Sequence, residues 1–165
     1  MNPDTDSTAA GIDLGAMRRA IAASRQALAD GNMPFGASLV APSGALLWVA
    51  QNDQVTSGDC TGHAELVLVR EVTRVLGAPA LRGATVYASG EPCAMCSGAM
   101  FWAGVARIVF AASQADIIRT LGGATLPITC AQVLQGASPA LRVDGPVLQD
   151  EAVEVLEGFA RPRAA

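Results

Sequence analysis

The stretch TVYASGEPCAMCSGAMFWAG (residues 85–104) predicts the central unit of the fold. Its first residues, 85–88, form a β-rich run, and residues 89–91 form a tight loop. Pro92 occupies the first turn of the helix that follows, where proline is best tolerated, and Gly104 can end that helix. We therefore expect a strand that leads directly into a helix, with two cysteines in the first helical turns.

The segments on either side of this unit alternate between helical and strand patterns. Before it we expect a helix over 12–30, a hairpin with strands at 36–41 and 45–50, a polar loop over 52–62 and a helix over 63–76. After it we expect a strand at 107–111, a short helix at 116–121, a last strand near residue 143 and a helix over 148–159. Because the later strands alternate with helices, that part of the sheet should be parallel and covered on both faces.

Composition indicates one globular domain in a chain of 165 residues, of which 51% are hydrophobic and 16% charged. We expect a flexible tail over 1–11, one domain over 12–160 and a frayed end over 161–165. The net charge is −4 and lysine is absent, which argues against a nucleic-acid partner. No apolar run reaches the ~18–20 residues of a membrane span, and residues 1–11 lack a secretory pattern. A soluble, cytoplasmic protein without a membrane partner is expected.

Two short motifs at expected helix starts carry the chemistry of the chain. The first contains His63 and Glu65, and the second contains Cys93 and Cys96. One imidazole and two thiolates suit zinc, and cysteines at i and i+3 lie on one face of a helix. Three protein ligands leave the fourth tetrahedral position to water or hydroxide, which is typical of a catalytic site. A metal set of His63, Cys93 and Cys96 is therefore predicted.

Glu65 is the candidate for proton transfer. Two residues correspond to about 200° around a regular helix, so His63 and Glu65 would point apart within one. At a helix start, however, the first residue can turn out of the helical course, and both side chains can then face one pocket. A carboxylate beside an activated water can accept its proton and pass it to a leaving group.

Other interpretations of these residues stay open on the sequence alone. Cys93 and Cys96 could form a redox dithiol, or the site could be a structural zinc site with Cys60 as its fourth ligand. We expect Cys60 to be a loop residue and Cys130 to belong to the core or the surface. Glu91 is expected to accept hydrogen bonds from backbone N–H groups, and Asp116 to be a solvated acid at a helix start.

Together, H-x-E at 63–65 and P-C-x-x-C at 92–96 resemble the signature of zinc-dependent nucleobase and nucleoside deaminases. The resemblance to this cytidine deaminase superfamily covers residues 34–159. It implies an α/β fold, a three-layer α/β/α sandwich with a mixed five-stranded sheet. It also implies one Zn²⁺ per chain, hydrolytic release of ammonia from a small aminated heterocycle, and a homodimer.

Two further stretches, MPFGA (33–37) and GAMFWA (98–103), are similar to bacterial guanine deaminases. This similarity implies that Asn52, Phe35, Trp102 and Ala64 contribute to the substrate site. The chain departs from that family in having no acid over 121–127 and no tyrosine near its C-terminus. We expect a guanine-like free base first, a nucleoside second and tRNA adenosine third. A different class would be a non-catalytic zinc-binding relative that serves as an interaction module.

Overall fold

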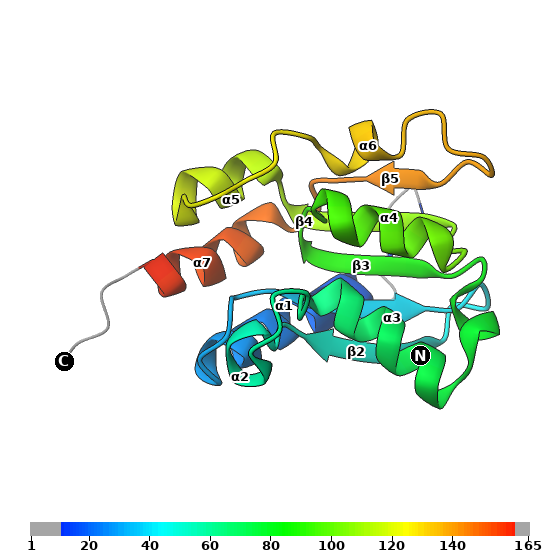
Figure 1. The fold of residues 1–165 in the computed structure, drawn as a ribbon, viewed down its shortest axis with the longest axis horizontal. Coiled ribbons are helices and arrows are strands. Elements are labelled where there is room, and N and C mark those ends of the chain that lie inside the picture. The colour runs from blue at the N-terminus through cyan, green and yellow to red at the C-terminus, as the bar shows by residue number, and fades with distance from the viewer. Residues whose placement is uncertain (1–10, 161–165) are drawn as a thin grey trace, which may run out of the picture.

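A five-stranded mixed sheet forms the centre of the computed structural model, which describes residues 11–160 (Figure 1). The strand order is β2-β1-β3-β4-β5. β1 pairs antiparallel with β2 and β3, whereas β4 pairs parallel with β3 and β5. The strands are β1 (Gly36–Val40), β2 (Leu46–Gln51), β3 (Thr85–Gly90), β4 (Arg107–Ala112) and β5 (Arg142–Asp144). The expected mixed five-stranded α/β fold is thus confirmed.

Helices cover both faces of this sheet. One face carries α1 (Leu14–Ala29), α5 (Gln114–Leu121) and α7 (Gln149–Ala160). The other face carries α3 (Ala64–Val75), α4 (Ala94–Trp102) and α6 (Cys130–Val133), with the 3-10 turn η1 (Ala78–Leu81) beside α3. Figure 1 shows α3 and α4 in front of the strands and α1 behind them. Each face has its own hydrophobic core, so the middle strands β1, β3 and β4 are buried on both sides.

The close packing of α1 on β1 depends on Gly36. A Cβ atom at this position would overlap the carbonyl oxygen of Ala20 and would lie 2.6 Å from the backbone nitrogen of Ser24. The Gly36 N–H also donates to the hydroxyl of Ser89 on β3. Gly36 therefore lets helix and strand approach each other, directly beside Phe35, which enters the functional site.

Several details differ from the sequence expectations. β3 extends to Gly90, and α4 begins at Ala94 with Cys93 as its N-cap, so Pro92 precedes the helix instead of occupying its first turn. The polar loop over 52–62 contains a short helix, α2 (Gln54–Ser57), which Asn32 holds by accepting hydrogen bonds from two of its N–H groups. Asp116 is nearly buried rather than solvated, because it forms a capping box with Ser113 and accepts a hydrogen bond from Gln149. The first helix begins at Leu14, after its Asp13 N-cap.

The expected tails fall almost entirely on residues 1–10 and 161–165, outside the described residues. Between residues 11 and 160, no helix combines the length and apolar character needed to cross a membrane.

Candidate active site

Three predicted metal ligands meet where two helices begin. His63 is the N-cap of α3 and Cys93 is the N-cap of α4, and both have extended backbone conformations. The Nδ1 atom of His63 lies 3.6 Å from the Sγ atoms of both Cys93 and Cys96. Within residues 11–160, this is the group of His, Cys, Asp and Glu side chains whose ligand atoms could hold one ion.

The spacing of these atoms fits a tetrahedral zinc ion. Zn–S bonds of about 2.3 Å and Zn–N bonds of about 2.0–2.1 Å, at the tetrahedral angle, give an S···N separation of about 3.6 Å. The two observed separations have this value. The donor set and its geometry therefore suit Zn²⁺, with His63, Cys93 and Cys96 as the residues that hold it.

The two thiols of the cluster differ in their electrostatics. Cys96 donates a hydrogen bond to Cys93, and this contact, together with His63, lowers the pKa of Cys93 to about 4. The same contact and burial raise the pKa of Cys96. The hydrogen bond with Cys93 also raises the pKa of His63. Binding of a metal requires both thiolates and a neutral imidazole, so it would release protons from this cluster.

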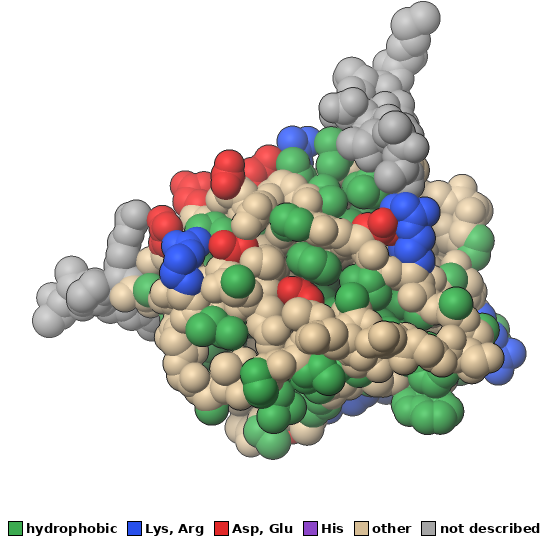
Figure 2. Space-filling view, turned by 90° about the horizontal axis from the view of Figure 1, so that it is seen from above, with side chains coloured by type: hydrophobic (Ala, Val, Ile, Leu, Met, Phe, Trp, Pro, Cys, Tyr) green, Lys and Arg blue, Asp and Glu red, His purple; other side chains and the backbone are tan. Residues whose placement is uncertain are grey.

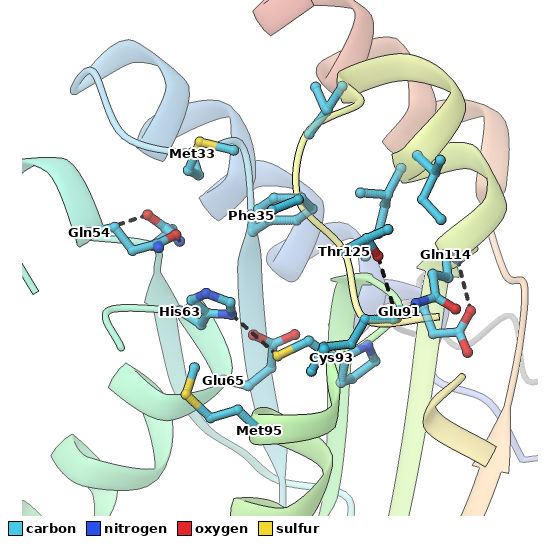
Figure 3. Close-up of a pocket in the computed structure, with 18 of the residues that line it drawn as sticks. Met33, Phe35, Gln54, His63, Glu65, Glu91, Cys93, Met95, Gln114 and Thr125 are labelled. Carbon is cyan, nitrogen blue, oxygen red and sulfur yellow. Dashed lines mark hydrogen bonds between the residues drawn. The ribbon is translucent and has the colours of Figure 1, made fainter. Parts of the chain in front are cut away.

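Glu65 lies beside this cluster and is almost completely buried. It belongs to the first turn of α3, whereas His63 stands just outside the helix. Because the N-cap residue leaves the helical course, both side chains face the same space, as Figure 3 shows. Burial raises the pKa of Glu65 to about 7. A carboxyl group in this condition can both accept and release a proton near neutral pH.

A cavity of about 490 Å³ opens in front of these residues. It lies between the loop before β1, the starts of α2, α3 and α4, and the far side formed by α5 and the loop after it (Figure 3). Its lining includes Met33, Phe35, Asn52, Gln54, His63, Glu65, Glu91, Cys93, Met95, Gln114, Ile117, Ile118, Leu121, Thr125 and Leu126. The predicted residues Phe35, Asn52, His63, Glu65 and Cys93 are thus brought together.

The structure does not bring Ala64 or Trp102 to this cavity. Ala64 is fully buried in the core between α3 and the sheet. Trp102 ends α4, and nine residues of helix place it about 13 Å along the axis from Cys93. Its side chain is 84% exposed and packs edge-on against Phe101. Neither side chain can therefore contact a ligand in the cavity of the same chain.

Gln54, Gln114 and Thr125 are polar lining residues that were not foreseen from the sequence. Gln54 pairs with Asn52, since Asn52 Nδ2 donates to Gln54 Oε1 over 2.8 Å and Asn52 Oδ1 accepts from the Gln54 N–H over 3.1 Å. Gln114, the first residue of α5, stands on the opposite side. The rule that ligands bind beyond the carboxyl ends of parallel strands could have identified Gln114, because it follows β4.

The remaining cysteines take no part in the cluster. Cys60 is exposed, and Cys130 is buried at the start of α6. Glu91 accepts hydrogen bonds from the backbone N–H groups of Gln114, over 2.8 Å, and Cys130, over 3.0 Å. It therefore ties the loop that carries Cys93 to the first residues of α5 and α6, as expected for a carboxylate that holds backbone donors.

The known proteins that resemble this chain in sequence include several deaminases. The model of the zinc-binding region of cytidine and deoxycytidylate deaminases matches residues 12–112. A probable cytosine deaminase of Schizosaccharomyces pombe is 38% identical over 151 residues, which are 89% of this chain and 91% of that protein. A guanine deaminase of Bacillus subtilis is 43% identical over 83 residues, or 50% of this chain and 53% of that protein.

Among solved structures, guanine deaminase from Nitrosomonas europaea has the same fold, with a TM-score of 0.77 and 21% sequence identity. The match covers 97% of this chain and 93% of that one. The family match extends over both motifs, including His63, Glu65, Cys93 and Cys96. The chain therefore belongs to the family of cytidine and deoxycytidylate deaminases that share this zinc-binding region.

Proposed function

We propose that this protein hydrolyses the exocyclic amine of a nucleobase or a related heterocycle and releases ammonia, with a guanine-like free base as the favoured substrate. One observation carries the proposal: the buried carboxyl group of Glu65 shares a cavity with a donor set that fits zinc. A structural zinc site or a redox dithiol has no use for such a carboxyl group.

A zinc ion held by His63, Cys93 and Cys96 would make a water molecule acidic enough to supply hydroxide near neutral pH. The Glu65 carboxylate accepts the proton of this water and delivers it to a ring nitrogen of the base. The same carboxylate then accepts the remaining proton of the oxygen that has added to the carbon and passes it to the leaving amine. The carbon gains the water oxygen and loses ammonia, so no redox partner is needed.

Phe35 and Asn52 are proposed to orient the base. Phe35 offers an aromatic face, which suits a flat heterocycle. The carboxamide of Asn52 is already oriented by Gln54, so its remaining hydrogen-bonding capacity has a defined direction. Preorganised polar groups of this kind provide specificity in otherwise apolar pockets.

The charges favour a neutral free base over a nucleotide or tRNA. Among the described residues that line the cavity, none is arginine, and lysine is absent from the sequence. A phosphate would therefore meet no arginine or lysine side chain there. Figure 2 shows the basic side chains of the face seen from above in separate groups rather than in one stripe. A nucleoside and tRNA adenosine remain alternative substrates, and a non-catalytic interaction module remains the alternative of a different class.

The test is ammonia release by the zinc-loaded protein from guanine, cytosine, adenine, their nucleosides and a tRNA stem-loop. A Glu65→Gln variant should keep zinc and lose at least the ~10²–10⁴-fold contribution of one general acid–base group. Full activity in that variant would contradict the assignment of Glu65. A zinc-loaded protein inactive on every compound would favour the interaction module.

We further propose a cytoplasmic homodimer. Trp102 and Met95 leave apolar surface exposed along α4, and burial of such surface favours association. Light scattering coupled to size exclusion should give twice the chain mass, and Trp102→Ser should weaken that assembly. A monomer at micromolar concentration would contradict this proposal.

A further inference from the structure

An aliphatic wall forms the side of the cavity that faces the metal ligands. Ile117, Ile118 and Leu121 of α5 belong to it, and Leu126 of the following loop extends it. Ile118 and Leu126 are 42% and 64% exposed, so this wall reaches the mouth of the cavity. Figure 3 shows the side chains of α5, the yellow-green helix, across the cavity from His63 and Glu65. The cavity thus has a polar end, with the metal ligands and Glu65, and an apolar end formed by α5 and Leu126.

Most of the polar atoms near this wall already have partners within the protein. Gln114 Nε2 donates to the carbonyl oxygen of Leu126 over 2.7 Å, and the hydroxyl of Thr125 contacts the same oxygen over 3.4 Å. Both carboxylate oxygens of Glu91 accept backbone N–H groups. Ribose hydroxyls placed here would lose water without gaining equivalent hydrogen bonds, which is costly.

The size of the cavity leaves room beyond the ring. A volume of about 490 Å³ lies within the range of about 300–1,000 Å³ found for pockets that bind drug-sized ligands. If the amine lies beside His63 and Cys93, the part of the ring remote from the amine points to α5. A substituent there would contact Ile117, Ile118 and Leu121.

We propose that the α5 side of the cavity binds an apolar substituent carried by the heterocycle on the part of its ring remote from the amine. Alkylated bases are then better substrates than the bare bases, and nucleosides are worse. This inference rests on the proposed function, because it takes the orientation of the ring from the site of deamination. It narrows the substrate class from aminated heterocycles in general to those with an apolar substituent.

Two matched series test the inference with the zinc-loaded protein: cytosine, 1-propylcytosine and cytidine, and guanine, 9-propylguanine and guanosine. In the series that is deaminated, each methylene buried against the wall should raise kcat/KM about four-fold. The nucleoside should fall below the bare base. A nucleoside equal to or better than the propyl compound would overturn the inference.

A variant isolates the contribution of the wall. Ile118→Asn makes the mouth polar at a partly exposed position, and it should reduce the ratio of kcat/KM for the propyl compound to that for the bare base. Val75→Asn changes an exposed aliphatic residue at the end of α3, outside the cavity lining, and should leave the ratio unchanged. An unchanged ratio in Ile118→Asn would overturn the inference.

The failure of the inference can be told from the failure of the proposed function. Deamination of a bare base without a preference for its propyl derivative contradicts the inference alone. If no compound is deaminated, calorimetric binding to the zinc-loaded protein decides. Tighter binding of the propyl compounds than of the nucleosides would support the apolar subsite, and the reverse order or no binding would overturn it.

Discussion

Replacing Glu91 with glutamine should lower the free energy of unfolding by about 1.5–3 kcal/mol. In the native chain, one carboxylate oxygen accepts the N–H of Gln114 and the other accepts the N–H of Cys130. A glutamine side chain offers only one oxygen. Its amide nitrogen would face the second N–H group, so one backbone donor at the start of α5 or α6 loses its partner.

The magnitude follows from the kind of bond that is lost. A hydrogen bond to a charged group contributes about 1.5–3 kcal/mol, and an unsatisfied buried donor carries a similar cost. For a domain of this size, that change corresponds to a fall of roughly 3–12 °C in Tm. KM should also rise, because Gln114 and the α5 wall would be held less firmly. The zinc content should stay the same, since all three ligands remain.

Urea unfolding at constant zinc concentration measures this difference. Glu157→Gln is the matched control, because it removes the same charge from an exposed site on α7 with no hydrogen bond or ion pair to residues 11–160. Its effect should stay within about 0.5 kcal/mol. If Glu91→Gln unfolds at the same urea concentration as the control, with the same slope, the two backbone contacts of Glu91 do not stabilise the fold.

Three further changes have defined outcomes. Hydrogen bonds from Ser113 above all lower the pKa of Asp116 to about 2. Protonation of this carboxylate should therefore destabilise the metal-free protein as the pH falls from 4 to 2. An Asp116→Asn variant should show a smaller decrease in pH-dependent urea unfolding, because Asp144, whose pKa is also lowered, still titrates. Cys96→Ser should abolish stoichiometric zinc binding in metal analysis. Removing zinc with a chelator should lower the free energy of unfolding of the native protein by about 2.7 kcal/mol relative to its value with zinc at 100 times the Kd. The chelator should leave the stability of the Cys96→Ser variant unchanged. Gly36→Ala should lower the free energy of unfolding by at least ~1–3 kcal/mol, because the added Cβ overlaps α1. Gly158→Ala in α7 should raise it by about 0.5–1 kcal/mol, because the added Cβ lies at an ordinary contact distance there. Equal calorimetric Tm values for the two variants would refute this packing argument.

Local sequence indicated the candidate metal ligands and the carboxylate proposed to transfer protons. His63, Glu65, Cys93 and Cys96 could be identified because their chemistry depends on residue type and on spacing within one or two helical turns. The hairpin, the strand predicted over 85–88 and the helix that follows were readable for the same reason, since periodicity and turn residues act over short distances. The structure extends this strand to Gly90. That the residue at a helix start can leave the helical course, and so share a pocket with Glu65, followed from local geometry; the structure places His63 as the N-cap, one residue before the helix.

The walls of the cavity were decided by the tertiary structure. Gln54 is far in the sequence from Gln114 and Ile118 of α5. The two sides of the cavity meet only because β1 lies between β2 and β3, and β4 runs parallel to β3. Trp102 resembled a pocket residue by motif, yet the direction of α4 carries it away from the cavity. Ligand chemistry is encoded by neighbouring residues, whereas the shape and polarity of a pocket depend on strand order and helix packing, which act between segments that no local pattern connects.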